Sequence, residues 1–87
     1  MSYIKLELSS MSELLVGDVF RTVEKIGNLS QTSEYEVVGK VVIESVPHPS
    51  FPELILHTAI FKAKNRRNGK GRTCKYKDCA FQVWRKV

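Results

Sequence analysis

Apolar and polar side chains alternate along much of this chain, and that two-residue period is typical of half-buried β-strands. In residues 3–8 the isoleucine and the leucines fall on one face, while Lys5 and Glu7 fall on the other. Residues 19–26 form a second expected strand, rich in β-branched side chains. Residues 34–45 alternate over the greatest length, so they form the strongest predicted strand.

Glycine and proline interrupt this pattern at defined points. Gly39, in the middle of the longest alternating segment, predicts a bulge or a sharp bend. Three prolines within residues 46–52 predict a rigid extended loop. Residues 53–63 are apolar on both faces, which predicts a central strand. Residues 72–77 and 80–87 are compatible with one bent strand or with two short strands.

The remaining segments are short connections. Ser10-Met11-Ser12-Glu13 has the form of a capping box and predicts one helical turn over residues 11–15. Residues 16–18 predict a turn, and the small polar residues of 27–33 predict a loop. No helix is available for a parallel crossover, so five to six antiparallel strands follow. We predict an all-β fold in a single domain, residues 1–87: a small antiparallel barrel.

One pattern resembles a known type of fold. Leu15-Val16-Gly17-Asp18-Val19-Phe20, followed by Glu34-Tyr35-Glu36-Val37-Val38, resembles the opening of SH3-like small barrels found in short bacterial and bacteriophage proteins. The likeness covers about a quarter of the chain, and here the gap between the two halves is longer. The resemblance implies an SH3-like barrel and names no function. For a barrel of this length an OB-like fold is the second candidate. Small β proteins of this type also resemble bacteriophage-encoded inhibitors of host enzymes.

Charge is divided between two parts of the chain. The formal net charge is +5, but residues 1–61 carry −4 and residues 62–87 carry +9. Such a polarised charge distribution attracts a polyanion to one region and speeds its encounter with the protein. Nucleic acid, either DNA or RNA, is the most common polyanion, and an acidic host protein is the alternative partner.

The basic residues concentrate in a segment that predicts a β-hairpin arm. Residues 61–77 hold eight basic residues and no acidic residue, and Asn and Gly residues in 65–71 predict the turn. Lysine and arginine neutralise phosphates and release counterions. Asn65, Asn68 and Thr73 are candidates for neutral hydrogen bonds to sugars or bases. The expected phosphate or partner contacts are Lys62, Lys64, Arg66, Arg67, Lys70, Arg72, Lys75 and Lys77.

Two aromatic residues near this arm are candidates for stacking on unpaired bases. Tyr76 lies within the basic segment, and Trp84 follows it in the last predicted strand. Trp84 lies opposite Phe81 and Val83 in strand parity. It would be a binding platform on the outer face and a core residue on the inner face, and a lone tryptophan in a small β domain is more often core.

Nothing in the sequence indicates catalysis. Cys74 and Cys79 are expected to be free thiols; zinc and a disulfide are the alternatives, and neither histidine has zinc-finger spacing. His57 shares a strand face with apolar residues, so we expect it to flank the core. Gly69-Lys70-Gly71 is too short for a phosphate-binding P-loop. We expect no enzyme activity, no cofactor and no metal.

The chain is expected to work in the cytoplasm. No apolar run approaches the length of about 18 residues that a membrane span needs, and no signal-peptide pattern follows Met1. An unpaired strand edge would be compatible with a monomer or with a homodimer. The sequence therefore predicts a non-enzymatic nucleic-acid-binding protein, or alternatively a modulator that binds a host enzyme.

Overall fold

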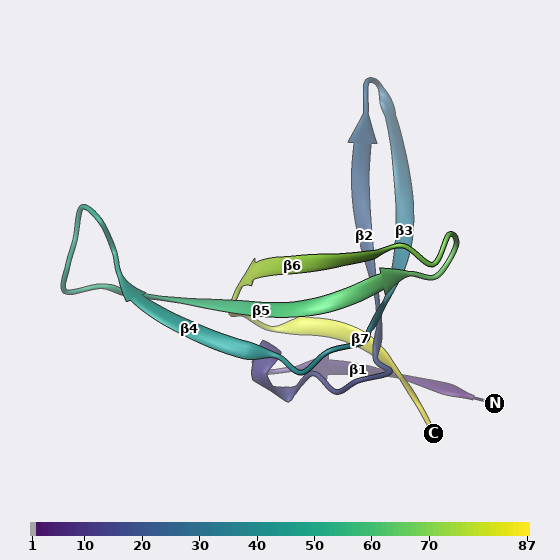
Figure 1. Cartoon of the computed structure of the whole chain (residues 1–87), viewed down its shortest axis with the longest axis horizontal. Coiled ribbons are helices and arrows are strands. Elements are labelled where there is room, and N and C mark those ends of the chain that lie inside the picture. Colours follow the sequence, from purple (N-terminus) through teal and green to yellow (C-terminus); the bar gives the residue numbers. More distant parts are fainter. Residues whose placement is uncertain (1) are drawn as a thin grey trace.

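The computed structural model describes residues 2–87 as seven β-strands and one short 3-10 helix (Figure 1). The elements are β1 (Tyr3–Leu8), η1 (Met11–Glu13), β2 (Val19–Ile26), β3 (Leu29–Val37), β4 (Val42–Pro47), β5 (Ile55–Asn65), β6 (Gly71–Lys77) and β7 (Phe81–Lys86). Within these residues, no helix is long and apolar enough to cross a membrane. The prediction of an all-β fold is confirmed.

The strands form one antiparallel sheet in the order β1-β7-β2-β3-β5-β4, and β6 pairs with the remaining edge of β5. β5 is therefore central, as its two apolar faces predicted. One of its edges pairs with β6, while the other pairs first with β4 and then with β3. Because β5 pairs with three strands, the sheet curls into a half-barrel, and β6 runs alongside β5 (Figure 1).

The inner face of the curled sheet holds an aromatic core centred on Phe20. The Phe20 side chain has no exposed surface. Its ring centroid lies 5.7 Å from Tyr35, 5.7 Å from Phe61, 6.3 Å from Tyr76 and 5.4 Å from Phe81. These residues come from β2, β3, β5, β6 and β7, so a single side chain joins five strands. Aromatic pairs at these separations stabilise the fold by more than the burial of their apolar surface alone.

The bend expected at Gly39 is confirmed. Val38 and Gly39 both donate their backbone N–H groups to the Lys62 carbonyl, at 2.9 and 3.2 Å. Two residues on one strand thus oppose one on the other, which is the arrangement of a β-bulge. A Cβ atom at position 39 would lie 3.3 Å from the Lys62 Cβ, so glycine allows the two chains to approach. The bulge divides the predicted strand 34–45 into β3 and β4.

The loop predicted for residues 27–33 is wrong. β2 and β3 form a hairpin whose last pair is Ile26 and Leu29, so only Gly27 and Asn28 form the turn. Gly27 has φ +64°, which suits the first position of a two-residue hairpin turn. Residues 29–33 are mostly small and polar, as in many loops, but their backbone groups pair with β2. The bulge, which divides one predicted strand into β3 and β4, explains why the sheet has seven strands rather than five or six.

Three other expectations need smaller adjustments. The helical turn forms as a 3-10 helix with the predicted capping box at Ser10 and Glu13. β5 begins two residues later than expected, because Leu54 still belongs to a turn and donates its N–H to the Phe51 carbonyl. His57, expected to flank the core, is exposed at the start of β5, where its Nδ1 lies 2.7 Å from the Ser45 hydroxyl.

A buried ion pair joins the start of β2 to the last strand. The Asp18 side chain is only 1% exposed, and its carboxylate accepts hydrogen bonds from Arg85 Nε at 2.9 Å and Arg85 Nη2 at 2.8 Å. It also accepts the Leu15 backbone N–H at 2.9 Å. The hydrogen bond to Asp18 raises the pKa of the Arg85 guanidinium above its ordinary value. This pair therefore links two segments that lie far apart in the sequence.

We expect Asp18→Ala to lower the free energy of unfolding by about 3 kcal/mol, because it leaves a partly buried guanidinium without its carboxylate. Urea denaturation followed by circular dichroism measures this loss. Glu44→Ala is the matched control, since Glu44 is exposed on β4 and forms no ion pair within residues 2–87. A loss below about 0.5 kcal/mol for Asp18→Ala, as expected for Glu44→Ala, would contradict this role.

Candidate nucleic-acid interface

The predicted basic arm is a hairpin of β5 and β6 with a well-bonded tip. The Asn65 Oδ1 accepts the backbone N–H groups of Arg67 and Asn68, at 2.8 and 3.3 Å. The Asn65 carbonyl accepts the Gly69 N–H at 2.8 Å, and the Asn65 N–H is donated to the Lys70 carbonyl at 2.9 Å. Gly69 has φ +73°, a conformation that glycine adopts without strain. The tip is thus shaped by its own asparagine and glycine residues.

These bonds change what the two asparagines can offer a ligand. The Asn68 Oδ1 accepts the Lys70 N–H at 2.9 Å, so the side-chain oxygens of both Asn65 and Asn68 are used within the turn. Their amide NH₂ groups make no hydrogen bond within residues 2–87. The amide NH₂ group of each asparagine is therefore available to donate to an added ligand, which suits phosphate and sugar oxygens.

Strand alternation places four lysines on the outer face of this hairpin. Lys62 and Lys64 lie on β5, and Lys75 and Lys77 lie on β6, all exposed. Thr73 pairs with Lys62 across the two strands and lies on the same face. We call these five residues the lysine face. The strand register places Lys77, Lys75, Lys62 and Lys64 in that order along the hairpin, over roughly 20 Å.

Carboxylates from the β2–β3 hairpin approach three of the eight cations. Lys64 Nζ lies 4.0 Å from Glu36, Arg66 Nη1 lies 4.0 Å from Glu34, and Arg72 Nη1 lies 3.5 Å from Glu24. Long exposed pairs of this kind are weak. Among residues 2–87, no carboxylate lies within 4.0 Å of the other five cations, which are Lys62, Arg67, Lys70, Lys75 and Lys77.

Arg72 differs from the lysines because it points to the inner side of the sheet. Its Nη1 donates to the Tyr35 hydroxyl at 3.1 Å, and its guanidinium carbon lies 5.0 Å from the centre of the Tyr35 ring. The hydrogen bond to Tyr35 raises the pKa of the Arg72 guanidinium above its ordinary value. Arg72 therefore covers the edge of the aromatic core, although the sequence placed it with the phosphate contacts.

The two aromatic candidates lie on opposite faces of the sheet. Tyr76 is half-buried on the inner face, 6.0 Å from Phe61 and 6.2 Å from Phe81, and burial raises the pKa of its hydroxyl. Trp84 is half-buried on the outer face of β7, so its expected place in the core is wrong. The structure thus brings Trp84, and not Tyr76, to the same face as the lysines.

Cations surround Trp84 on both neighbouring strands. The Arg21 guanidinium lies 4.3 Å from the centre of the indole ring, and Lys5 Nζ lies 6.0 Å from it. Close by, the Arg66 guanidinium lies 5.7 Å from the Tyr3 ring. A shallow cavity joins Tyr3, Arg21, Arg66 and Trp84 with Val19 and Glu34.

Sequence reasoning missed Tyr3, Lys5 and Arg21 as members of this surface. They lie within the acidic part of the chain, far from the basic segment. They reach Trp84 because β7 pairs with both β1 and β2. The sequence shows only that Tyr3 and Lys5 share the polar face of the first predicted strand. It does not show which strand pairs with it.

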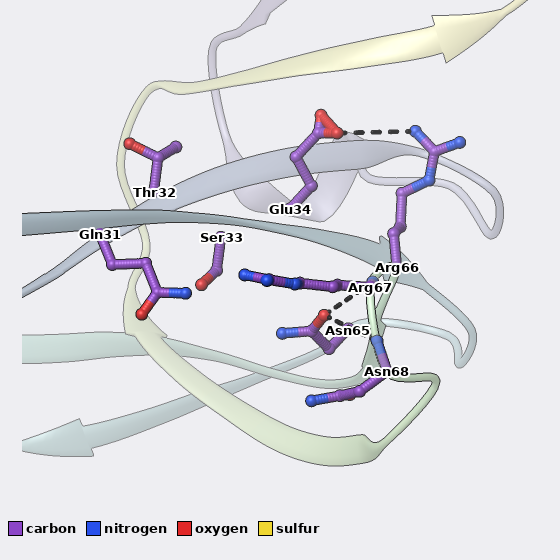
Figure 2. A pocket seen from close by; sticks show the side chains of 8 residues that line it. All are labelled: Gln31, Thr32, Ser33, Glu34, Asn65, Arg66, Arg67 and Asn68. Carbon is purple, nitrogen blue, oxygen red and sulfur yellow. Dashed lines mark hydrogen bonds and ion pairs between the residues drawn. The ribbon is translucent and has the colours of Figure 1, made fainter.

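A polar cleft lies where the hairpin tip meets β3 (Figure 2). Its volume is about 820 Å³, and residues 31–34 and 65–68 line it. Figure 2 shows the Arg67 side chain extending across the cleft toward Ser33, while Arg66 turns away to its ion pair with Glu34. The side chains of the two consecutive arginines of the tip therefore point in different directions (Figure 2).

The two cysteines lie in different environments. Cys74 is buried, Cys79 is exposed, and both thiols are free. Within residues 2–87, no group of three or more histidine, cysteine, aspartate or glutamate side chains could hold a metal ion. Comparison of the chain with protein-family models, with characterised proteins and with solved structures found no significant match. Any functional inference therefore rests on the geometry described above.

We expect Arg72→Ala to lower the free energy of unfolding by about 1 kcal/mol, because Tyr35 loses a hydrogen bond and a cation–π contact. Lys75→Ala, on the same strand but the opposite face, should change it by less than about 0.5 kcal/mol. Denaturant titration of both variants measures the difference. Equal losses for the two variants would contradict a structural role for Arg72.

Proposed function

We propose that this protein is a non-enzymatic nucleic-acid-binding protein that holds phosphates on the outer face of the β5–β6 hairpin. The observation that carries the proposal is the lysine face. Lys62, Lys75 and Lys77 lie on one exposed surface of two paired strands without a carboxylate partner within residues 2–87. Unpaired surface lysines require no internal ion pair to be broken before a phosphate binds.

The rigid frame beneath the lysine face supports the same proposal. The inward side chains of these strands, including Phe61, Ala63 and Cys74, are buried in the core. The lysine backbones are consequently held in place, and only the flexible side chains must be ordered on binding. Contacts made by lysine with phosphate are largely independent of base sequence. We therefore expect weak sequence specificity and strong dependence on salt.

Trp84 and the cations around it extend this surface across the sheet. Across neighbouring strands, Trp84 pairs with Val19, Val19 pairs with Glu36, and Glu36 pairs with Lys64. Three strand spacings of about 4.8 Å place Trp84 roughly 14 Å from Lys64, within the span of a few nucleotides. Trp84 is half-buried and Tyr3 is exposed, so both rings are candidates for stacking with unpaired bases, and Arg21 adds positive charge beside Trp84.

The proposal includes two finer points from the sequence. The half-barrel is proposed to be a variant of the SH3-like barrels of short bacterial and bacteriophage proteins, on the basis of the turn at Gly17-Asp18 and the strand through Tyr35. The protein is proposed to act in the cytoplasm, where DNA and RNA are accessible.

A second candidate function is modulation of a host enzyme by direct protein contact. The observation that favours it is the β4–β5 hairpin, which projects from the body at the left of Figure 1. Its loop exposes Phe51 and Leu54, and Ile55 is exposed at the start of β5. Grouped exposed apolar side chains often mark protein-binding surfaces. An acidic groove on the partner would then meet the lysine face.

We expect the triple variant Lys62→Gln/Lys75→Gln/Lys77→Gln to reduce affinity for a 20-nucleotide single-stranded DNA and to reduce the dependence of binding on salt. Each lost phosphate contact lowers the magnitude of the log–log salt slope by about 0.7, so three contacts lower it by about 2. Fluorescence anisotropy at a series of salt concentrations measures both quantities.

Lys25→Gln is the control, because Lys25 lies near the tip of the β2–β3 hairpin, away from the lysine face and from Trp84. It should leave most of the salt slope intact. If the triple variant kept the affinity and the slope of the unaltered protein, the proposal would be rejected. Repeating the titrations with RNA and with duplex DNA of the same length identifies the preferred nucleic acid.

Copurification separates the two candidate functions. The nucleic-acid proposal predicts a high absorbance at 260 nm before nuclease treatment and no stoichiometric protein partner after it. The modulator alternative predicts a partner retained in equal amount after nuclease treatment. Retention of such a partner through the β4–β5 loop would be tested with Phe51→Ser/Leu54→Ser.

We also expect single-stranded DNA to change the fluorescence of Trp84, which is the only tryptophan in the chain. Stacking of a base against the exposed part of the indole should quench its emission. Titration of the protein with oligo-dT measures the quenching. An unchanged emission spectrum at saturating DNA would show that Trp84 lies outside the interface, even where the lysine variants confirm binding.

A further inference from the structure

The first half of β3 has an unpaired edge. β2 covers one edge of β3 along its length, whereas β5 pairs with the other edge only from Tyr35 to Val37. The Arg66 N–H donates to the Glu34 carbonyl at 3.0 Å, which shows that the Glu34 carbonyl faces away from β2. Because backbone groups alternate along an antiparallel strand, those of Ser30 and Thr32 face the same way. They have no partner strand within residues 2–87.

This edge belongs to a hairpin that extends beyond the rest of the sheet. Figure 1 shows β2 and β3 projecting from the body at the top of the view. Val23, Ile26 and Leu29 are 67%, 62% and 75% exposed along it. Val23 lies on one face of the hairpin, while Ile26 and Leu29 lie on the other. A hairpin of only two strands is marginally stable in water, and a third strand normally supports it.

The free edge of β3 also lacks the features that prevent strand pairing. Residues 29–33 contain no charged residue and no proline. By contrast, other strands with a free edge are interrupted by such residues: β1 contains Lys5 and Glu7, β2 contains Arg21, Glu24 and Lys25, β4 contains Glu44 and Pro47, and β6 contains lysines. Charges and prolines of this kind block edge-to-edge association. The first half of the β3 edge lacks this protection.

We propose that this edge pairs with the same edge of a second copy of the chain, forming a symmetric dimer with a continuous antiparallel sheet. Identical strands pair in antiparallel orientation around a two-fold axis, so the edge is complementary to itself. Residues 22–33 carry one acid, Glu24, and one base, Lys25. The net charge of the segment is zero, so the excess positive charge of the chain does not oppose pairing here. A neutral edge also gives a charged partner no electrostatic attraction.

The available backbone groups define the register of this dimer. Pairing Ser30 of each copy with Thr32 of the other uses all free groups and places Gln31 on the two-fold axis. A shift that centres Thr32 would place Ser30 against Glu34, whose carbonyl already accepts the Arg66 N–H. A shift that centres Ser30 would pair Thr32 with Asn28, a residue of the hairpin turn.

The cleft of Figure 2 provides room for the second copy. In the proposed register, Leu29 of the second copy lies beside Ser33, with its turn next to residues 65–68. The cavity of about 820 Å³ occupies this position, between residues 31–34 and the tip of the β5–β6 hairpin. The Arg67 side chain would cover the incoming Leu29. The lysine face takes no part in these contacts, so the dimer and the proposed nucleic-acid binding are independent.

Sedimentation equilibrium of nuclease-treated protein in high salt tests the proposal. We expect a mass that rises with concentration toward twice the chain mass of 9.9 kDa. Thr32→Pro removes an outward N–H that no strand of the same chain uses, and should raise the dissociation constant at least about tenfold. Thr32→Val keeps that N–H and should still dimerise. A monomeric mass up to submillimolar concentration, or equal dimerisation of both variants, would overturn the proposal.

Disulfide trapping tests the register and does not depend on how well Thr32→Pro folds. In a Cys79→Ser background, Gln31→Cys places two thiols on the axis as a non-hydrogen-bonded pair, where Cα atoms lie about 4.5 Å apart and a disulfide can form. Ser33→Cys is the control, because its neighbour is Leu29 of the second copy. We expect rapid crosslinking of Gln31→Cys only. Equal crosslinking of both variants, or none, would exclude this register.

Discussion

The pairing of β5 along both of its edges is the constraint on which the rest of this structure depends. β6 occupies one edge, while β4 and β3 share the other and separate at the Gly39 bulge. Because one strand holds three partners, the sheet curls and its inner side chains converge on Phe20. The same strand carries Lys62 and Lys64 outward. Core formation and presentation of the cationic surface are therefore two consequences of one pairing pattern.

Strand alternation then divides the basic segment into parts with different roles. Lys75 and Lys77 face solvent on β6, whereas Arg72 and Tyr76 on the same strand face the core. Eight cations that look equivalent in the sequence thus have different environments. Carboxylates of the β2–β3 hairpin approach three of them. This distribution reduces the candidate phosphate-binding set and makes the lysines, rather than Arg72, the informative positions for mutation.

The β2–β3 hairpin has a different chemistry from the β5–β6 hairpin. It has no net charge beyond the body of the sheet, and it exposes apolar side chains and an unpaired edge. The β5–β6 hairpin presents positive charge, which attracts a polyanion. The β2–β3 hairpin presents unpaired backbone groups, which can form hydrogen bonds with another strand. The free β3 edge adjoins the β5–β6 hairpin at the tip residues 65–68, while the lysine face lies on the outer side of that hairpin.

The sequence by itself determined the all-β class, the bend at Gly39, the capping box at Ser10 and the basic hairpin with its Asn and Gly turn. Each depends on alternation or on the conformational preference of a few neighbouring residues. Tertiary structure alone decided that residues 29–33 extend a strand, that Arg72 binds Tyr35, and that Tyr3 and Arg21 join Trp84. These features depend on pairing between segments distant in the chain, and local composition carries no information about such register.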